Sequence, residues 1–213
     1  MANADQITGR LNMVIALPME AKSIVKHFNF ELLSTSPFKV YTNSEKSIWL
    51  VICGVGKVSA GAATAHLASI SAADGATTWL NLGVAGHKSL PIGSIVAAHK
   101  IIDAGSGLSW SLDRNLDHQI ITKSILTLDK ESHDYTEDEA CEMEAAGFYQ
   151  TAIRFSSRDH IYCIKIISDN ERNAEINYRE VGELIQQNIS AIESIVKHLL
   201  KLSAGRSELE KTA

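Results

Sequence analysis

Two segments decide how this chain is interpreted: 141–149, Cys-Glu-Met-Glu-Ala-Ala-Gly-Phe-Tyr, and 166–170, Ile-Ile-Ser-Asp-Asn. Glu144 is flanked by Met143 and small apolar residues, and Asp169 ends an apolar stretch. A carboxylate held against apolar groups is unfavourable unless a partner compensates it. The residue types leave two interpretations open. Either Asp169 caps a helix and Glu144 belongs to a buried ion pair, or both acids have a functional role.

The composition predicts one globular domain of ordinary character. The 213 residues are 45% hydrophobic and 21% charged, with a mean hydropathy of −0.01. A net charge of −5 and a pI near 5.9 give no basic surface for nucleic acid or an anionic membrane. The first ten residues lack an apolar signal core, and no apolar run reaches the roughly 18 residues that a membrane helix needs. A small-molecule partner is therefore favoured.

The three cysteines, Cys53, Cys141 and Cys163, lie in or beside apolar stretches. Their odd number and their spacing favour buried reduced thiols, and hence a cytoplasmic protein. No two cysteines or histidines have the spacing of metal ligands, so we expect no metal.

Apolar runs of strand length alternate with helical patterns along the chain. We expect strands over 11–17, 38–42, 47–53, 77–82, 92–102, 120–128 and 161–167. We expect helices over 19–28, 54–71 and 177–202. The segments 103–117 and 129–139 look like irregular excursions. Residues 1–10 are predicted to be loose and 203–213 to be a disordered polar tail.

This alternation predicts a single three-layer α/β domain over 11–202, with a twisted, largely parallel mixed sheet flanked by helices. Gly83 to Gly86 is expected to form an exit loop at the carboxyl end of a strand, where open α/β sheets bind ligands. Gly54 and Gly56 also suit a dinucleotide-binding turn, but Ser59 occupies the place of the third glycine.

Four motifs in a common order resemble the nucleoside phosphorylase and nucleosidase superfamily, particularly the methylthioadenosine/S-adenosylhomocysteine nucleosidases. They are the two segments quoted above together with 51–58, Val-Ile-Cys-Gly-Val-Gly-Lys-Val, and 81–86, Asn-Leu-Gly-Val-Ala-Gly. The resemblance runs from about residue 12 to about residue 200. It implies that 142–144 is extended and that a helix begins just after, although Thr136 and Glu139 have the spacing of a capping box.

The resemblance also implies roles for five residues. Asp169 would be the general acid at the purine N7, oriented by Ser168. Glu144 would accept hydrogen bonds from the ribose hydroxyls, with Met143 against the sugar. Glu20, just after the first strand, would position or deprotonate the attacking water, although a lone glutamate at a helix start commonly compensates the helix dipole. Further substrate contacts would come from Val84, Ala85, Gly86 and Glu142.

Arginine usage favours water over phosphate as the nucleophile. Phosphorylases of this superfamily hold phosphate with arginines from the first half of the chain. Between Arg10 and Arg114 this chain has none. Lys57, His87 and Lys88 are the remaining candidates for that task.

The sequence also departs from the family pattern. Val84 stands where Ser or Thr is usual, and the stretch before Glu142 lacks the pattern that stacks on adenine. Candidates to replace that stack are His133, Tyr135 and Phe148, of which Phe148 also suits the core. Lys165 occupies a position where Arg is frequent and is a candidate to pair with an acid in the sheet.

We therefore expect a homodimeric or larger enzyme, without metal or organic cofactor, that hydrolyses purine or modified-purine nucleosides carrying no 5′ charge. A phosphate-dependent phosphorylase and a non-catalytic nucleoside binder are the alternatives. The 5′ group is expected to meet 28–38, 103–117 and the helix face near Tyr149. These segments hold more apolar and acidic groups than basic ones.

Overall fold

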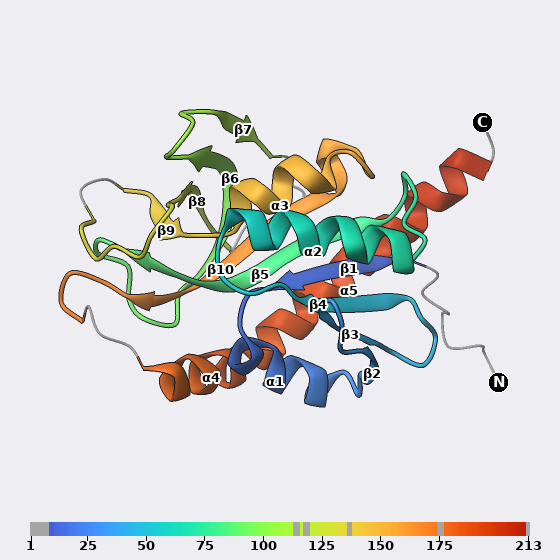
Figure 1. The fold of residues 1–213 in the computed structure, drawn as a ribbon, viewed down its shortest axis with the longest axis horizontal. Helices are drawn as coiled ribbons and strands as arrows, with labels where there is room; N and C mark the ends of the chain where they lie inside the picture. Colours follow the sequence, from blue (N-terminus) through green and yellow to red (C-terminus); the bar gives the residue numbers. More distant parts are fainter. Residues whose placement is uncertain (1–8, 113–115, 117–119, 136–137, 174–176, 212–213) are drawn as a thin grey trace.

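A computed structural model describes residues 9–112, 116, 120–135, 138–173 and 177–211 (Figure 1). The strands are β1 (Leu11–Ile15), β2 (Glu31–Ser34), β3 (Lys39–Thr42), β4 (Ile48–Ile52), β5 (Thr78–His87), β6 (Ile95–Asp103), β7 (Ser109–Ser111), β8 (Ile121–Thr127), β9 (Ala140–Glu142) and β10 (Ile161–Asp169). The helices are α1 (Pro18–His27), α2 (Lys57–Ile70), α3 (Ala145–Ala152), α4 (Tyr178–Gln187) and α5 (Ile189–Lys211), with one 3-10 turn at Arg158–His160.

The strands form one mixed sheet that closes on itself. At its centre β1 runs parallel to β4 and β5, and β5 runs parallel to β10. From β10 the sheet continues through β6, β8 and β9, and β9 pairs back onto β5. The predicted α/β class is confirmed. We call the closed set β5, β10, β6, β8 and β9 the strand ring.

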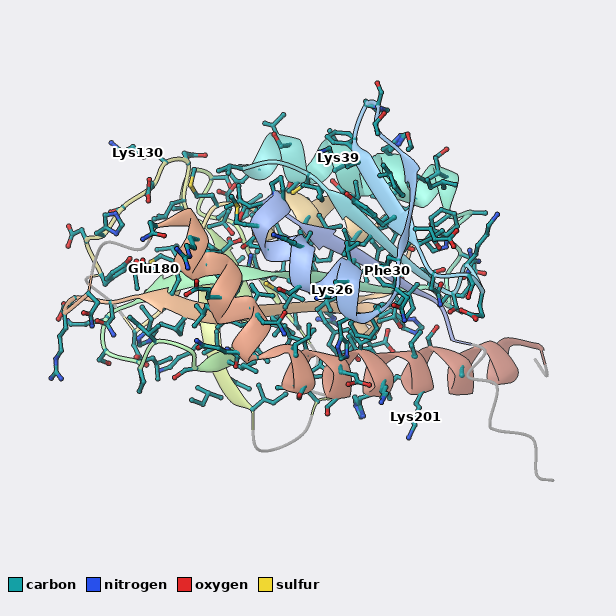
Figure 2. All side chains as sticks on the ribbon, turned by 90° about the horizontal axis from the view of Figure 1, so that it is seen from below. Lys26, Phe30, Lys39, Lys130, Glu180 and Lys201 are labelled. Atoms are coloured by element: carbon teal, nitrogen blue, oxygen red, sulfur yellow. The ribbon has the colours of Figure 1, made fainter. Side chains whose placement is uncertain are left out.

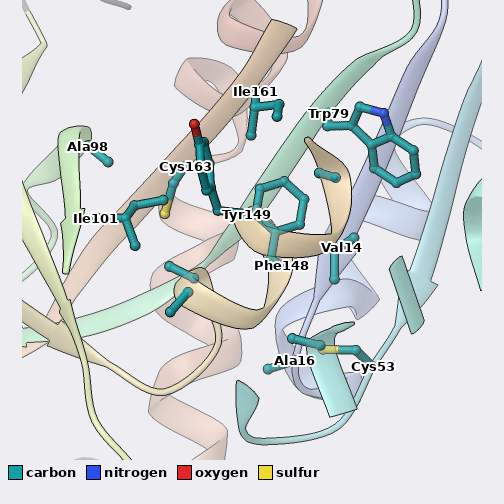
Figure 3. Packing of buried hydrophobic residues seen from close by; sticks show 14 of the residues in the cluster. Val14, Ala16, Cys53, Trp79, Ala98, Ile101, Phe148, Tyr149, Ile161 and Cys163 are labelled. Atoms are coloured by element: carbon teal, nitrogen blue, oxygen red, sulfur yellow. The ribbon is translucent and has the colours of Figure 1, made fainter. Parts of the chain in front are cut away.

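Helices cover both faces of the sheet. Figure 1 shows α2 and α3 on one side and α1, α4 and α5 on the other. Side chains alternate between the two faces of a sheet along a strand, so successive residues of β1 pack against both helix layers. Val14 packs in the cluster beneath α2 and α3, whereas Met13 and Ile15 pack towards the other helices. Figure 3 shows the first cluster, with Phe148 among Trp79 and Ile161.

Small residues let α2 and α3 approach closely. The predicted stripe of α2 is buried, with Ala60 and Ala63 in the core. Gly147 lies where α3 meets the first turn of α2, and a Cβ added to it would overlap the carbonyl of Lys57. The junction between β9 and α3 is thereby fixed against the start of α2.

Several elements differ from the sequence prediction in length. Gly83 to Gly86 remains inside β5 rather than forming an exit loop, because β10 and β9 pair with this part of the strand. The excursion 103–117 contains β7, and residues 31–34 form the unpredicted edge strand β2. The other predicted strands and helices are confirmed, including the helix that begins at Ala145. The segment 142–144 was expected to be extended, but β9 ends at Glu142, and Glu144 has helical backbone angles of φ −118° and ψ −36°.

The C-terminal helix also departs from the prediction. It breaks at Asn188, whose amide side chain donates to the Leu184 carbonyl, and then continues to Lys211. Ser203 is buried and its hydroxyl donates to the Ala76 carbonyl, so the predicted disordered tail begins as docked helix. Figure 2 shows Lys201 on the outer side of α5. Residues 1–10 were predicted to be loose, but Gly9 is buried and the Arg10 side chain donates to the carbonyls of Ser71 and Ala72. Residues 1–8 and 212–213 and the capping-box position 136 lie outside the described residues.

None of the helices in the described part of the chain is long and apolar enough to cross a membrane.

Candidate active site

One cavity of about 660 Å³ opens near the carboxyl ends of β1, β5 and β10 and at the start of α3. It is lined by all nine residues that the sequence nominated as catalytic or substrate-binding: Glu20, Val84, Ala85, Gly86, Glu142, Met143, Glu144, Ser168 and Asp169. These residues come from distant parts of the chain. The parallel pairing of β1 and β10 with β5, and the antiparallel pairing of β9 with β5, bring them together.

Glu20 lies in the first turn of α1 and is buried. Its Oε2 accepts the Leu17 amide at 2.8 Å, and its Oε1 accepts the Val84 amide at 3.0 Å. Burial raises the pKa of Glu20, while these hydrogen bonds and the charge of Lys165 act in the opposite direction. A Cβ on Gly83 would lie 2.9 Å from Oε1, so this carboxylate depends on a glycine in β5. Glu20 therefore caps its helix and also faces the cavity.

Glu142 ends β9 and is held entirely by protein groups. Its carboxylate accepts the Thr127 hydroxyl at 2.6 Å, the Glu144 amide at 2.9 Å and the Ala145 amide at 2.9 Å. It also forms an ion pair with Lys165, with Nζ 2.8 Å from Oε2. The expectation that Lys165 pairs with an acid in the sheet is confirmed. Glu142 thus fixes the turn that presents Glu144.

Glu144, two residues after Glu142, lines the cavity. Its Oε1 accepts the Gly56 amide at 2.8 Å, from a glycine whose φ of +99° few other residues tolerate. Burial and the neighbouring Glu142 carboxylate raise the pKa of Glu144 to about 7, although Lys165 acts in the opposite direction. In the described residues the ion pair of Lys165 is with Glu142, so the sequence-level interpretation of Glu144 as an ion-pair partner does not hold.

Asp169 ends β10 and does not cap a helix. A register shift between Ile167 and Asp169 turns Ser168 and Asp169 towards the cavity. The Ser168 hydroxyl donates to Oδ1 at 2.5 Å, and the Tyr135 hydroxyl donates to Oδ2. His133 Nδ1 lies 3.5 Å from the same Oδ2. Burial raises the pKa of Asp169, and the hydrogen bond with His133 acts against it.

Of the three candidates to stack on a base, two line the cavity. His133 and Tyr135 belong to the loop after β8, whereas Phe148 is buried in the core. Tyr149 packs against Trp110 and does not line the cavity, and no lining residue comes from 28–38 or from the described part of 103–117. The expected 5′ segments are therefore not part of this cavity.

The loop and rim residues were missed by the sequence analysis. They are Ala16, Leu17, Val55, Leu128, Glu131, Ser132, Cys141, Asn177 and Glu180. Figure 2 labels Glu180 on α4, whose first turn includes it. Loop residues carry no periodic pattern, so only their position after a strand could have suggested them.

Positive charge is scarce around this cavity. The described residues that line it include no lysine and no arginine. Lys57 is held at 2.6 Å by both Asp103 and Asp129. His87, at the end of β5, is buried, with its Nδ1 accepting two backbone amides and its Nε2 3.2 Å from Asp138.

Cys53, Cys141 and Cys163 are free, and burial raises their pKa values to about 12, 11 and 12. They are therefore protonated at neutral pH. No group of three or more His, Cys, Asp or Glu side chains in the described part of the chain is arranged to hold a metal ion.

The fold matches solved structures over almost their whole length. A 5′-methylthioadenosine/S-adenosylhomocysteine nucleosidase from S. pneumoniae, solved with a transition-state inhibitor, has a TM-score of 0.67 and 22% identity, covering 92% of this chain and 99% of that chain. The corresponding enzyme from Campylobacter jejuni gives 0.70 and 18%, with 92% and 99% covered. A futalosine hydrolase mutant from Helicobacter pylori gives 0.70 and 16%, with 89% and 99% covered.

No protein-family model matches the sequence, and a search of curated proteins finds no match either. At this level of identity the solved structures show the fold. The chain has the fold of these solved nucleosidases, to which the motif resemblance also pointed.

Proposed function

We propose that this protein is a nucleosidase that hydrolyses the N-glycosidic bond of a purine or modified-purine nucleoside without a charged 5′ group. The observation that carries the proposal is the set of three buried carboxyl groups, Glu20, Glu144 and Asp169, on one cavity. Each has a raised pKa, and each comes from a different element of the fold. The likeness to solved nucleosidases supports it.

Asp169 is the proposed general acid. Its raised pKa keeps a larger share of the carboxyl protonated near neutral pH than an exposed aspartate would have. The proton passes to the purine N7 as the bond to the sugar breaks, and the bonding electron pair leaves with the base. Ser168 holds Oδ1, so the proposed donor oxygen is Oδ2, which accepts the Tyr135 hydroxyl in the structure.

Glu144 is the proposed sugar-binding carboxylate. Bond cleavage leaves positive charge on the ribosyl group, and a nearby anion stabilises that charge, as carboxylates do in sugar hydrolysis. The Gly56 amide fixes one oxygen of Glu144 and leaves it in place for the ribose hydroxyls. Met143 lines the same cavity and supplies an apolar surface for the sugar.

Glu20 is the proposed base for water. Its two oxygens are held by amides of Leu17 and Val84, so its position is set before substrate binds. Its raised pKa suits it to accept a proton from water as the water oxygen bonds to the sugar carbon. Val84 takes part through its amide, which needs no side-chain hydroxyl.

Charge argues against the phosphorylase alternative. A phosphate nucleophile would enter a cavity whose described lining has four buried acids, Glu20, Glu142, Glu144 and Asp169, and no lysine or arginine. Burying an anion beside unpaired carboxylates is strongly unfavourable. The same reasoning, with Glu131 and Glu180 on the rim, disfavours a 5′-monophosphate.

The proposal includes two properties of the whole molecule. Three free cysteines with raised pKa values suit a reducing cytoplasm. Two exposed apolar side chains, Val55 in the cavity lining and Val58 in the first turn of α2, suit self-association into a homodimer or a larger assembly. Sedimentation at micromolar concentration tests the second property, and a monomer would contradict it.

A nucleoside panel tests the function. Methylthioadenosine, S-adenosylhomocysteine, futalosine, adenosine and inosine are incubated with the protein, with and without phosphate, and released base is measured. We expect release of base in phosphate-free buffer. Strict dependence on phosphate would contradict hydrolysis and support the phosphorylase alternative. A nucleoside that binds but stays intact would support a non-catalytic nucleoside-binding protein. Competition between a cleaved nucleoside and its 5′-monophosphate tests the charge argument, which tighter monophosphate binding would overturn.

A further inference from the structure

Two side chains of the loop after β8 meet the oxygen of Asp169 that the proposed acid role requires. The Tyr135 hydroxyl donates to Oδ2, and His133 Nδ1 lies 3.5 Å from the same atom and 3.4 Å from the Tyr135 oxygen. The His133 side chain is 44% exposed, whereas that of Asp169 is 10% exposed. His133 therefore connects a buried acid to solvent.

The proposed hydrolysis creates a need for such a connection. Each turnover transfers one proton from Asp169 to the departing base and one proton from water to Glu20. The two carboxyl groups are different, so neither returns to its starting state by the reaction itself. The oxygens of Glu20 are held by the amides of Leu17 and Val84. The described hydrogen bonds provide no path from Glu20 to Asp169, so the first must lose its proton to solvent and the second must gain one from it.

We propose that His133 and Tyr135 form a proton relay that reprotonates Asp169 between turnovers; this inference rests on the proposed nucleosidase function. A solvent proton adds to Nε2 of a His133 that carries its other proton on Nδ1. The Nδ1 proton passes to the Tyr135 oxygen while the Tyr135 hydroxyl proton passes to Oδ2 of Asp169. The carboxylate becomes the acid, the imidazolium becomes neutral, and His133 regains its first tautomer by exchange with water.

The surroundings of His133 suit this task. Imidazole gains and loses protons near neutral pH and can accept at one nitrogen while it donates at the other. Glu131 lies on the outer side, with Oε1 3.7 Å from Nε2, where an incoming proton would arrive. The rings of His133 and Tyr135 meet edge to face, and Nδ1 is the ring nitrogen that lies 3.4 Å from the hydroxyl. His133 and Tyr135 are thus positioning residues that act through Asp169.

Steady-state kinetics of three variants tests the relay on the nucleoside that the wild-type protein cleaves best. We expect His133→Gln to lower kcat on the order of tenfold with KM unchanged, and added imidazole to restore kcat. Tyr135→Phe keeps the ring and should lower kcat in the same way. The double variant should be no slower than the slower single variant, because both remove one path. His27→Gln is the matched control: His27 is a half-exposed histidine paired with Glu193 outside the cavity, and its variant should keep the wild-type kcat.

Each other outcome has a definite meaning. If the wild-type protein cleaves no nucleoside, the proposed function fails and the relay fails with it. If the wild-type protein is active and His133→Gln keeps full kcat, the relay alone is overturned. A loss that imidazole does not restore, or a raised KM, would assign His133 a structural or base-stacking role instead and would also overturn the relay.

Discussion

Lys165 and Glu142 form an ion pair of 2.8 Å in which each side chain is only 1% exposed. Burial lowers the pKa of Lys165, but the adjacent Glu142 carboxylate outweighs it, so Lys165 remains charged. Glu142 in turn accepts the amide of Glu144. Lys165 therefore stabilises the carboxylate of Glu142, which in turn holds the backbone of Glu144, the proposed sugar-binding residue.

Replacing Lys165 should destabilise the fold strongly. Lys165→Met leaves the buried Glu142 carboxylate without its partner, and breaking a buried pair in this way costs about 3–5 kcal/mol. Urea denaturation at neutral pH measures the free energy of unfolding. The control is Lys197→Met, which removes an exposed ion pair with Glu193 and should cost less than about 1 kcal/mol. Equal losses in the two variants would contradict this account of the buried pair.

Asp169→Asn should abolish turnover and leave the protein folded. The amide has nearly the same shape but cannot deliver the proton, and losing a general acid lowers rates by about 10²–10⁴-fold. Released base is measured alongside circular dichroism. Ser168→Ala keeps the acid and removes the hydroxyl that donates to Oδ1 and lies 3.4 Å from the Ala85 carbonyl, so its loss of activity should be smaller. Wild-type activity in Asp169→Asn would remove this residue from the mechanism.

Glu144→Gln should change how stability depends on pH. The folded-state pKa of about 7 lies above the ordinary value of 4.5, so the folded protein keeps a proton that the unfolded chain loses. The stabilising contribution is complete below the unfolded pKa and is lost as pH rises through the folded one, a change of about 3 kcal/mol.

Urea denaturation of both proteins at several pH values between 4.5 and 8 checks this expectation. The wild type should lose stability relative to Glu144→Gln as the pH rises, because the neutral amide does not titrate. Parallel curves would show that Glu144 keeps an ordinary pKa in the fold.

Gly147→Ala should lower the free energy of unfolding by about 3 kcal/mol. The added Cβ overlaps the Lys57 carbonyl, which is backbone and cannot turn away. Gly205→Ala is the control, since Gly205 lies in α5 with nothing within 4 Å of the added atom, and it should gain up to about 1 kcal/mol. Thermal unfolding of the two variants measures both effects. A neutral Gly147→Ala would mean that α2 and α3 separate easily.

The sequence predicted the elements that carry a strong periodic pattern and the residues that follow strands. Strand ends such as Ser168 and Asp169 are visible because an apolar run stops at them. The pairing of Lys165 was also foreseeable, since a charge inside an apolar strand needs a partner.

Other features depend on contacts between distant segments. The segment 83–86 was predicted to be a loop because glycine has a low propensity for strands. Pairing with β9 and β10 nevertheless keeps it extended. The approach of Tyr135 to Asp169 joins an irregular loop to a strand end, and no local pattern encodes it. The segments expected to meet the 5′ group likewise contribute no described residue to the cavity.

The strand ring has a consequence for local opening. β9 has only three residues, but it pairs with β5 on one side and β8 on the other. A strand this short would fray at the edge of an open sheet, whereas here it can detach only if two ladders break together. Its amide hydrogens should therefore exchange with solvent through the same large opening as the core, while β2, which pairs with β3 alone in the described sheet, exchanges by itself. The carboxylates at the end of β9 stay in place for as long as the whole fold does.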